Sequence, residues 1–232
     1  GTVRAGGDAI DAGAPVPDYR AKSWDALFSS IKDTPGVKAV ILNHARDIHG
    51  NTRPFGPKLH NAAVGENVEG WTLQANAMEL INSGATQTDG LQLLRDWMTQ
   101  LNYGNFMTPV GSSDSHTVNT YIVGQGRTYI RVDDSDPGNI NVDAATQRFV
   151  EGQVLVSYGL LTEITVDGMF KSGQFARVMP DDAYVMADIR VLGPHWVQAD
   201  RVQLYLNGEL VREEAIARGE SNPPGVIWSD RW

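Results

Sequence analysis

The first third of the chain alternates between apolar positions at helical spacing and continuous apolar runs. Residues 22–34 (KSWDALFSSIKDT) carry apolar side chains at helical spacing, and Pro35-Gly36 predicts where that helix ends. Residues 37–44 (VKAVILNH) are apolar and rich in β-branched side chains, which predicts a buried strand. A helix, a short turn and an apolar strand in this order favour an α/β fold with a parallel sheet.

The same alternation continues through the middle of the chain. Residues 76–82 (NAMELIN) and 107–116 (MTPVGSSDSH) predict two more strands, and residues 88–104 between them predict a helix. The expected inward stripe of this helix consists of apolar side chains four or three positions apart: Leu91, Leu94, Trp97 and Leu101. The polar segment 45–70 predicts a long loop, a type of segment that often forms a lid or a site wall.

After a strand, a helix and a strand predicted over residues 127–132, 141–152 and 153–159, the period of the pattern changes to two. Three segments then alternate apolar and polar side chains, and VDG and LNG supply tight turns: residues 160–168, 183–193 and 200–216. We therefore divide the chain into an α/β part, residues 1–156, and an antiparallel β domain, residues 157–232. The tail, residues 217–232, is expected to be one more strand or a loose end.

Polar side chains end three of the predicted strands. His44 ends the first, Glu79 and Asn82 lie near the end of the second, and Asp114 and His116 follow the third. In parallel α/β folds this edge of the sheet binds ligands, and residues two apart on an extended segment point the same way. Imidazole and carboxylate groups suit Zn, Mn or Fe, so we expect a divalent-metal site, with a polar turn as the alternative.

Other polar and aromatic residues have two interpretations each. Glu79 is a metal ligand or a member of a structural ion pair, and Arg46 binds an anionic substrate group or a surface carboxylate. His60, in the long polar segment, is expected to be solvated. Trp196 and Tyr205 are expected in the core of the β domain, with an exposed binding platform for carbohydrate or a partner as the alternative.

Composition removes several classes of function. The net charge of -9 and the absence of a Lys/Arg cluster argue against nucleic acid as a partner. There is no cysteine, so thiolate metal sites and thiol nucleophiles are excluded. No window approaches the roughly 18 apolar residues of a membrane helix, and no membrane partner is expected. The compartment stays open, with a periplasmic or secreted location among the alternatives.

Three segments of the sequence, taken together, resemble a known superfamily. VILNHARD, NAMELINSG and LLRDWMTQLNYGNFMTPVGSSDSH are similar to the second half of a PHP (polymerase and histidinol phosphatase) domain, and most similar to the CehA/McbA-type metallohydrolases. The resemblance covers about residues 37–116, and GSSDSH is its most specific part. The later segments also resemble the region that leads to a C-terminal β-sandwich in such proteins.

The resemblance implies the C-terminal part of a distorted (β/α)7 PHP barrel, followed by an antiparallel β-sandwich-like domain. It also implies divalent metal ions and a metal-activated water that hydrolyses a small-molecule phosphoester, carbamate or ester. His44, Asp114 and His116 would then be metal ligands, and Glu79 a further one. Arg46 and Asn82 are the candidates for binding the substrate, which we expect to be anionic. No catalytic residue is assigned.

Two departures from the PHP pattern weaken the expectation of a complete enzyme. Ala45 stands where the family has proline after the strand-end histidine, and no histidine precedes His44, so the opening His-x-His strand is absent. The residues present would be part of the family's ligand set, and this fragment would hold metal weakly or not at all. The alternative is a non-catalytic binding or scaffold protein with a degenerate PHP barrel.

Overall fold

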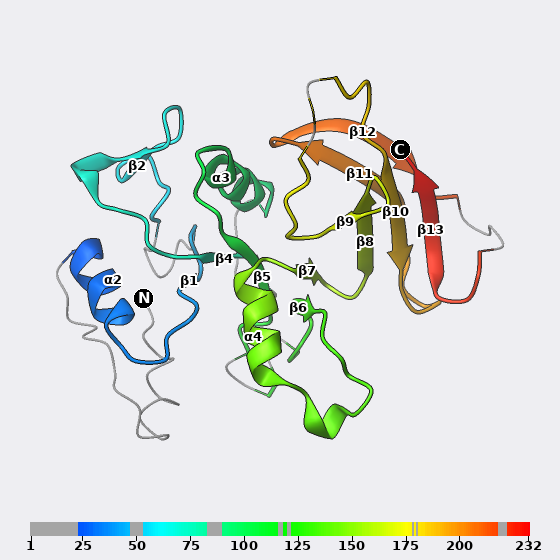
Figure 1. Cartoon of the computed structure of the whole chain (residues 1–232), viewed down its shortest axis with the longest axis horizontal. Coiled ribbons are helices and arrows are strands. Elements are labelled where there is room, and N and C mark those ends of the chain that lie inside the picture. The colour runs from blue at the N-terminus through cyan, green and yellow to red at the C-terminus, as the bar shows by residue number, and fades with distance from the viewer. Residues whose placement is uncertain are drawn as a thin grey trace. The chain divides into compact units, whose positions relative to one another are not determined.

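The computed structural model shows a mixed α/β protein with three described helices and several small sheets (Figure 1). The described residues are 23–46, 53–82, 90–115, 118–119, 122–177, 179, 181–217 and 222–232. The chain forms two compact units, Gly1–Leu80 with Ala85–Met107 and Ile81–Gly84 with Thr108–Trp232. None of the described helices has the length and apolarity needed to span a bilayer. In the described part of the chain the strands do not close into a barrel.

The first unit begins with helix α2 (Trp24–Lys32), which confirms the helix predicted there. The Ser23 side chain caps it by accepting a hydrogen bond from the Ala26 main-chain N at 3.2 Å. Phe28 is the fully buried residue of this helix, and Asp33 is its C-cap.

A parallel pair of strands follows α2, as the sequence predicts. Strand β1 (Ile41–Leu42) pairs with β4 (Ala77–Asn82), with Ile41 opposite Ala77. β1 is shorter than predicted because a side chain replaces a main-chain hydrogen-bond partner at Val40. The Val40 main-chain N donates to Asn76 Oδ1 at 2.8 Å. β4 carries the buried side chains Ala77 and Met78, and β1 contributes Leu42 (7% exposed) to the core while Ile41 is 40% exposed.

The segment 45–70, predicted as a long polar loop, contains short strands and buried side chains in its described part, so that prediction is wrong for residues 53–70. It contains β2 (His60–Asn61), β3 (Glu66–Asn67) and the 3-10 turn η1 (Val68–Gly70). Its buried side chains are Pro54, Phe55 and His60, and buried Trp71 follows directly after it. The Trp71 indole N–H donates to the Leu59 carbonyl at 3.2 Å, which ties the two ends of the segment together.

Helix α3 (Gly90–Asn102) lies where it was predicted, but its inward face is shifted. Leu93 and Gln100 are its buried side chains, whereas Leu91, expected inside, is 50% exposed. An apolar pattern cannot identify a polar residue at an inward position, so it missed Gln100 and placed Leu91 inside. The core of this unit consists of Phe28, Leu42, Ala45, Phe55, Trp71, Ala75, Met78, Leu93 and Met107.

The second unit begins with strand β5 (Thr108–Ser112). β6 (Arg127–Ile130) and β7 (Val154–Ser157) form an antiparallel pair, joined by the 3-10 turn η2 (Pro137–Asn139) and helix α4 (Val142–Val150). The Asn141 side chain caps α4 by accepting from the Ala144 N at 2.9 Å. The Thr108 hydroxyl donates to the Phe149 carbonyl at 2.7 Å, which fixes β5 to the end of α4.

The period-two segments form antiparallel strands, as predicted. The four-stranded sheet has the order β13-β10-β8-β9, and β11 pairs with β12. The bounds of these strands are β8 Leu161–Val166, β9 Phe170–Lys171, β10 Ala187–Leu192, β11 Arg201–Leu206, β12 Glu209–Ala215 and β13 Val226–Arg231. β13 confirms the alternative in which the tail adds a strand. The boundary near residue 157 stays a prediction.

The β11–β12 hairpin turns at Asn207-Gly208, and both residues have positive φ (53° and 92°), as a tight primed turn requires. Val202, on its inner face, belongs to a second hydrophobic core. That core consists of Ala187, Ile189, Val191, Val202, Ile216 and Trp228. Ala187, Ile189 and Val191 alternate along β10, so the period-two pattern of that strand places three members of this cluster on one face.

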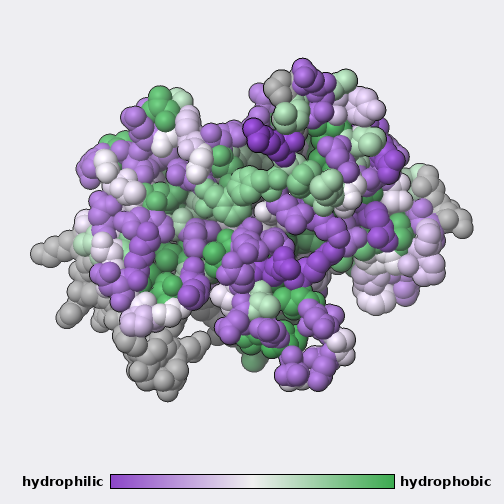
Figure 2. All heavy atoms as spheres, in the orientation of Figure 1, coloured by the Kyte–Doolittle hydropathy of each residue, from purple (hydrophilic) through white to green (hydrophobic). Residues whose placement is uncertain are grey.

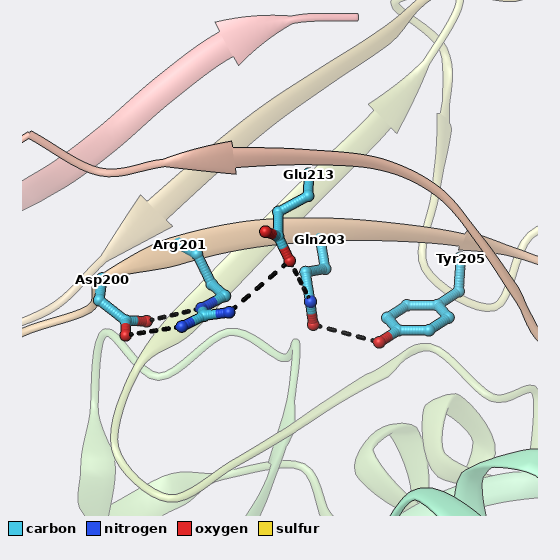
Figure 3. A network of polar contacts seen from close by, with 5 residues as sticks. All are labelled: Asp200, Arg201, Gln203, Tyr205 and Glu213. Atoms are coloured by element: carbon cyan, nitrogen blue, oxygen red, sulfur yellow. Dashed lines mark hydrogen bonds and ion pairs between the residues drawn. The ribbon is translucent and has the colours of Figure 1, made fainter.

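The other face of the β11–β12 hairpin is polar (Figure 3). Arg201 binds Asp200 through two hydrogen bonds of 3.3 Å and lies 3.8 Å from Glu213. Gln203 donates to Glu213 and accepts from the Tyr205 hydroxyl. Surface pairs of this kind contribute about 0–1 kcal/mol each, so the network orders the hairpin face more than it stabilises the unit.

The exposed surface combines both classes of side chain. Figure 2 shows a mostly hydrophilic face with hydrophobic side chains between the charged ones. Trp196 is 72% exposed, so the expectation that it lies in the core is wrong; its edge contacts His195. Trp196 lies in the loop between β10 and β11, where the period-two pattern of the strands does not apply.

Candidate functional site

The loop after β1 places His44 on a buried carboxylate of β4. The His44 main-chain N donates to Glu79 Oε2 at 2.9 Å, and His44 Nδ1 lies 2.8 Å from the same oxygen. Glu79 is 2% exposed, whereas the His44 side chain is 27% exposed. His44 has a φ of 51°, a left-handed conformation that is uncommon for a residue other than glycine. The parallel pairing of β1 with β4 places Glu79, in the middle of β4, beside the end of β1, where His44 lies.

The residues that follow His44 are also fixed. Ala45 is completely buried in the core of the first unit. Arg46 donates through Nε and Nη2 to Asp96 of α3 at 2.6 and 2.8 Å, in the two-pronged geometry that guanidinium and carboxylate favour. Two of the Arg46 nitrogens are therefore engaged by Asp96, and the expectation that Arg46 binds substrate stays a prediction.

The motif VGSSDSH lies in the second unit. β5 ends at Ser112, and Asp114 adopts a left-handed φ of 50°, which aspartate tolerates in turns. The extended geometry expected to make residues 114 and 116 point the same way therefore does not continue through Asp114. The Ser115 hydroxyl donates to the Ser113 hydroxyl at 3.1 Å within this turn. His116 lies outside the described residues.

Asn82, the last residue of β4, is 5% exposed. Its carbonyl oxygen accepts a hydrogen bond from the Tyr158 hydroxyl at 3.3 Å. Both residues belong to the second unit, so Asn82 has a structural contact there. Its role in binding substrate stays a prediction.

The donor set is chemically suited to a divalent cation. His44, Glu79 and Asp114 offer imidazole and carboxylate groups, the ligand types of Zn, Mn and Fe sites. The described residues contain no group of three His, Asp or Glu side chains close enough to hold a metal ion. The described donors fit the chemistry of the cation, and the complete ligand set stays a prediction.

His60 has a structural role, contrary to the expectation of a solvated histidine. It is 4% exposed, its Nδ1 lies 2.8 Å from Asn67 Oδ1, and its Nε2 lies 3.3 Å from Gln100 Nε2. The amide of Gln100 can only donate to Nε2, so Nδ1 carries the hydrogen and donates to Asn67. Both ring nitrogens are thus engaged, and the Phe55 ring packs edge-on against the imidazole. His60 is therefore not a candidate ligand.

Sequence reasoning missed two residues that shape this unit. Asp96, the partner of Arg46, is separated from it by 50 positions, and nothing in the local pattern links the two. Gln100 accepts from the Asn105 amide at 2.9 Å and completes the His60 network. A polar residue at the helical spacing of a buried stripe, three positions after Trp97, is the signal that could have identified it.

Comparisons of the chain with protein-family models, with curated proteins and with solved structures gave no match.

Proposed function

We propose that the chain is the C-terminal part of a PHP-type metal-dependent hydrolase, with a partial (β/α)7 barrel followed by a β-sandwich-like domain. Its substrate would be a small, anionic phosphoester, or a carbamate or ester. A divalent Mn, Zn or Fe ion, when bound, would supply a water nucleophile at neutral pH and polarise the scissile bond. The residues that would hold it are His44, Asp114 and His116, with Glu79 either as a further ligand or as the carboxylate that supports His44.

The His44–Glu79 pair is the observation that carries this proposal. A partly exposed imidazole supported by a buried carboxylate at the end of a parallel strand is the arrangement in which metal-binding histidines are commonly held. A purely structural histidine would be expected to bury its ring, as His60 does. Arg46, two residues after His44, and Asn82, the last residue of β4, would contact the substrate.

The alternative is a binding or scaffold protein that keeps the fold without the chemistry. It predicts no metal uptake and no hydrolysis by the intact protein, whereas a PHP-type hydrolase shows both, so measurements on the intact protein separate the two proposals.

The test measures bound metal and hydrolysis in the same samples. The protein is equilibrated with Mn, Zn or Fe(II), and bound metal per chain and the hydrolysis of a chromogenic phosphodiester and of a chromogenic ester are determined. We expect Asp114→Ala and His116→Ala each to lower bound metal at fixed free metal at least tenfold and to abolish hydrolysis.

His195→Ala is the matched control, because His195 is an exposed histidine of the β domain. It should leave both readouts unchanged. Equal metal content and equal hydrolysis in all four proteins would reject the proposed ligands. A protein that takes up none of the three metals would instead support the scaffold alternative.

A further inference from the structure

We infer that Glu79 is a positioning residue for His44: it holds the Nδ1 side of the imidazole and leaves Nε2 as the ring's metal-donor atom. This inference rests on the proposed function. It differs from the ligand role that the PHP resemblance implies for Glu79, and it assigns the two residues of the pair to different tasks.

The geometry of one oxygen atom carries the first step. Glu79 Oε2 accepts the His44 main-chain N–H at 2.9 Å and lies 2.8 Å from His44 Nδ1. A carboxylate oxygen only accepts, so Nδ1 must be the donor and must carry the hydrogen. In the neutral imidazole that hydrogen on Nδ1 makes Nε2 the nitrogen with a lone pair for a cation.

Burial carries the second step. Glu79 is 2% exposed and follows Ala77 and Met78, which are fully buried on the same strand, whereas the His44 side chain is 27% exposed. A buried carboxylate is tolerated when it is hydrogen-bonded, and His44 supplies two hydrogen bonds to Oε2. The carboxylate thus lies behind the imidazole, on the core side, and the imidazole is the member of the pair that reaches the surface.

The main chain around His44 carries the third step. Its left-handed φ of 51° is fixed on one side by Glu79 and on the other by buried Ala45. Arg46 then anchors the loop to Asp96 of α3. Three successive residues are therefore held by the body of the first unit, and the ring is preorganised before any ligand arrives.

The test uses histidine labelled with ¹⁵N, since the chain has only five histidines. Long-range ¹H–¹⁵N spectra identify which ring nitrogen carries the hydrogen, and His44→Gln assigns the His44 signals. We expect the Nδ1–H form for His44 in the metal-free protein. Titration with Zn²⁺ should shift the Nε2 resonance and leave the hydrogen on Nδ1.

Zinc affinity of the Glu79 variants separates positioning from ligation. In Glu79→Gln the amide oxygen still accepts from the main chain and from Nδ1, so the affinity should fall by no more than about tenfold, whereas Glu79→Ala should lose about 10–100-fold. His44→Ala should lose more than either. Glu66→Gln, which changes an exposed glutamate of β3, is the matched control and should bind as the unmodified protein does.

Two results overturn this inference alone: a Zn²⁺ titration that shifts Nδ1 of His44, or a Glu79→Gln protein as impaired as His44→Ala. Glu79→Gln conserves the size of the side chain, so the test stands even where Glu79→Ala does not fold. If the unmodified protein binds no cation at all, the proposed function fails, and the metal-facing role of Nε2 fails with it; the Nδ1–H signal would then report a structural pair only.

Discussion

At the residue scale, the buried polar side chains set the structure of the first unit. His60, Gln100 and Asn105 form a chain of hydrogen bonds inside it, and Asn67 extends the chain by donating to the Trp71 carbonyl at 2.7 Å. His60 and Gln100 are buried, whereas Asn67 and Asn105 at the ends of the chain of bonds are half-buried. Removal of one member therefore leaves others unsatisfied, which costs more than the lost bond itself.

Gln100→Met tests this network. Methionine fills a similar volume but accepts nothing from Asn105 and donates nothing to His60. Buried His60 Nε2 and the half-buried Asn105 amide lose their partner, so we expect the free energy of unfolding to fall by about 1–3 kcal/mol. Urea unfolding followed by tryptophan fluorescence measures it.

Gln147→Met on α4 is the control for that substitution, because Gln147 is exposed and bonds only to Glu151 on the helix surface. Its effect should stay within about 0.5 kcal/mol. Equal effects of the two substitutions would show that the network around Gln100 adds no stability.

At the element scale, the sequence predicted most helices and strands and missed the details set by single contacts. α2, α3, α4 and the antiparallel strands follow from apolar spacing and turn residues, which are local properties. β1 was predicted too long because the Asn76 side chain, distant in sequence, replaces its ladder at Val40. The structure within residues 53–70 was missed because the buried residues of this segment are too few and too scattered to produce a period.

Gly111 shows how closely β5 approaches its neighbours. Its N–H donates to the Thr128 hydroxyl, which in turn donates to the Gly111 carbonyl, both at 2.9 Å. A Cβ at this position would lie 2.5 Å from the Arg127 carbonyl oxygen and 2.8 Å from Val156 Cγ1. The glycine of VGSSDSH therefore has a packing role, independent of any metal.

Gly111→Ala should destabilise the second unit by about 1–3 kcal/mol, because the main chain of β6 cannot move away without breaking its pairing with β7. The midpoint of urea unfolding reports the change. Gly138→Ala, in η2, serves as the comparison: its Cβ would meet only Asp136 at an ordinary 3.4 Å. A Gly111→Ala protein as stable as Gly138→Ala would contradict the close approach.

At the scale of the whole molecule, the described residues form two separate hydrophobic clusters, one in each compact unit. Leu93 lies in the first and is 1% exposed, and Ile189 lies in the second and is 4% exposed. No residue belongs to both clusters. Stability in the two units therefore comes from different sets of contacts.

Leu93→Ala and Ile189→Ala should each lower the free energy of unfolding by about 2–5 kcal/mol. Since the two residues share no buried neighbour, the double variant should equal the sum of the single variants within about 0.5 kcal/mol. A double-mutant cycle in urea measures the coupling. A coupling energy well above that value would mean that the two cores act as one.

The candidate site could be predicted only in part from the sequence. Polar strand ends identified His44 and Glu79, because parallel strands that lie side by side must bring their carboxyl ends to one edge. Asp96 and the left-handed conformations of His44 and Asp114 could not be predicted, since they depend on contacts between distant residues and on turns that no local period encodes. These features determine how the side chains of the candidate site are oriented, rather than which fold the chain adopts.

The left-handed main chain at His44 has an evolutionary consequence. Glycine or asparagine would occupy that conformation with less strain, a saving of about 1 kcal/mol. In homologues that do not need the His44 imidazole for function, neutral substitution should therefore replace His44 first. Glu79 should be replaced after it, because its hydrogen bond to the imidazole would be lost. Homologues that keep the histidine in spite of this conformational strain would be the ones in which selection still maintains its chemistry.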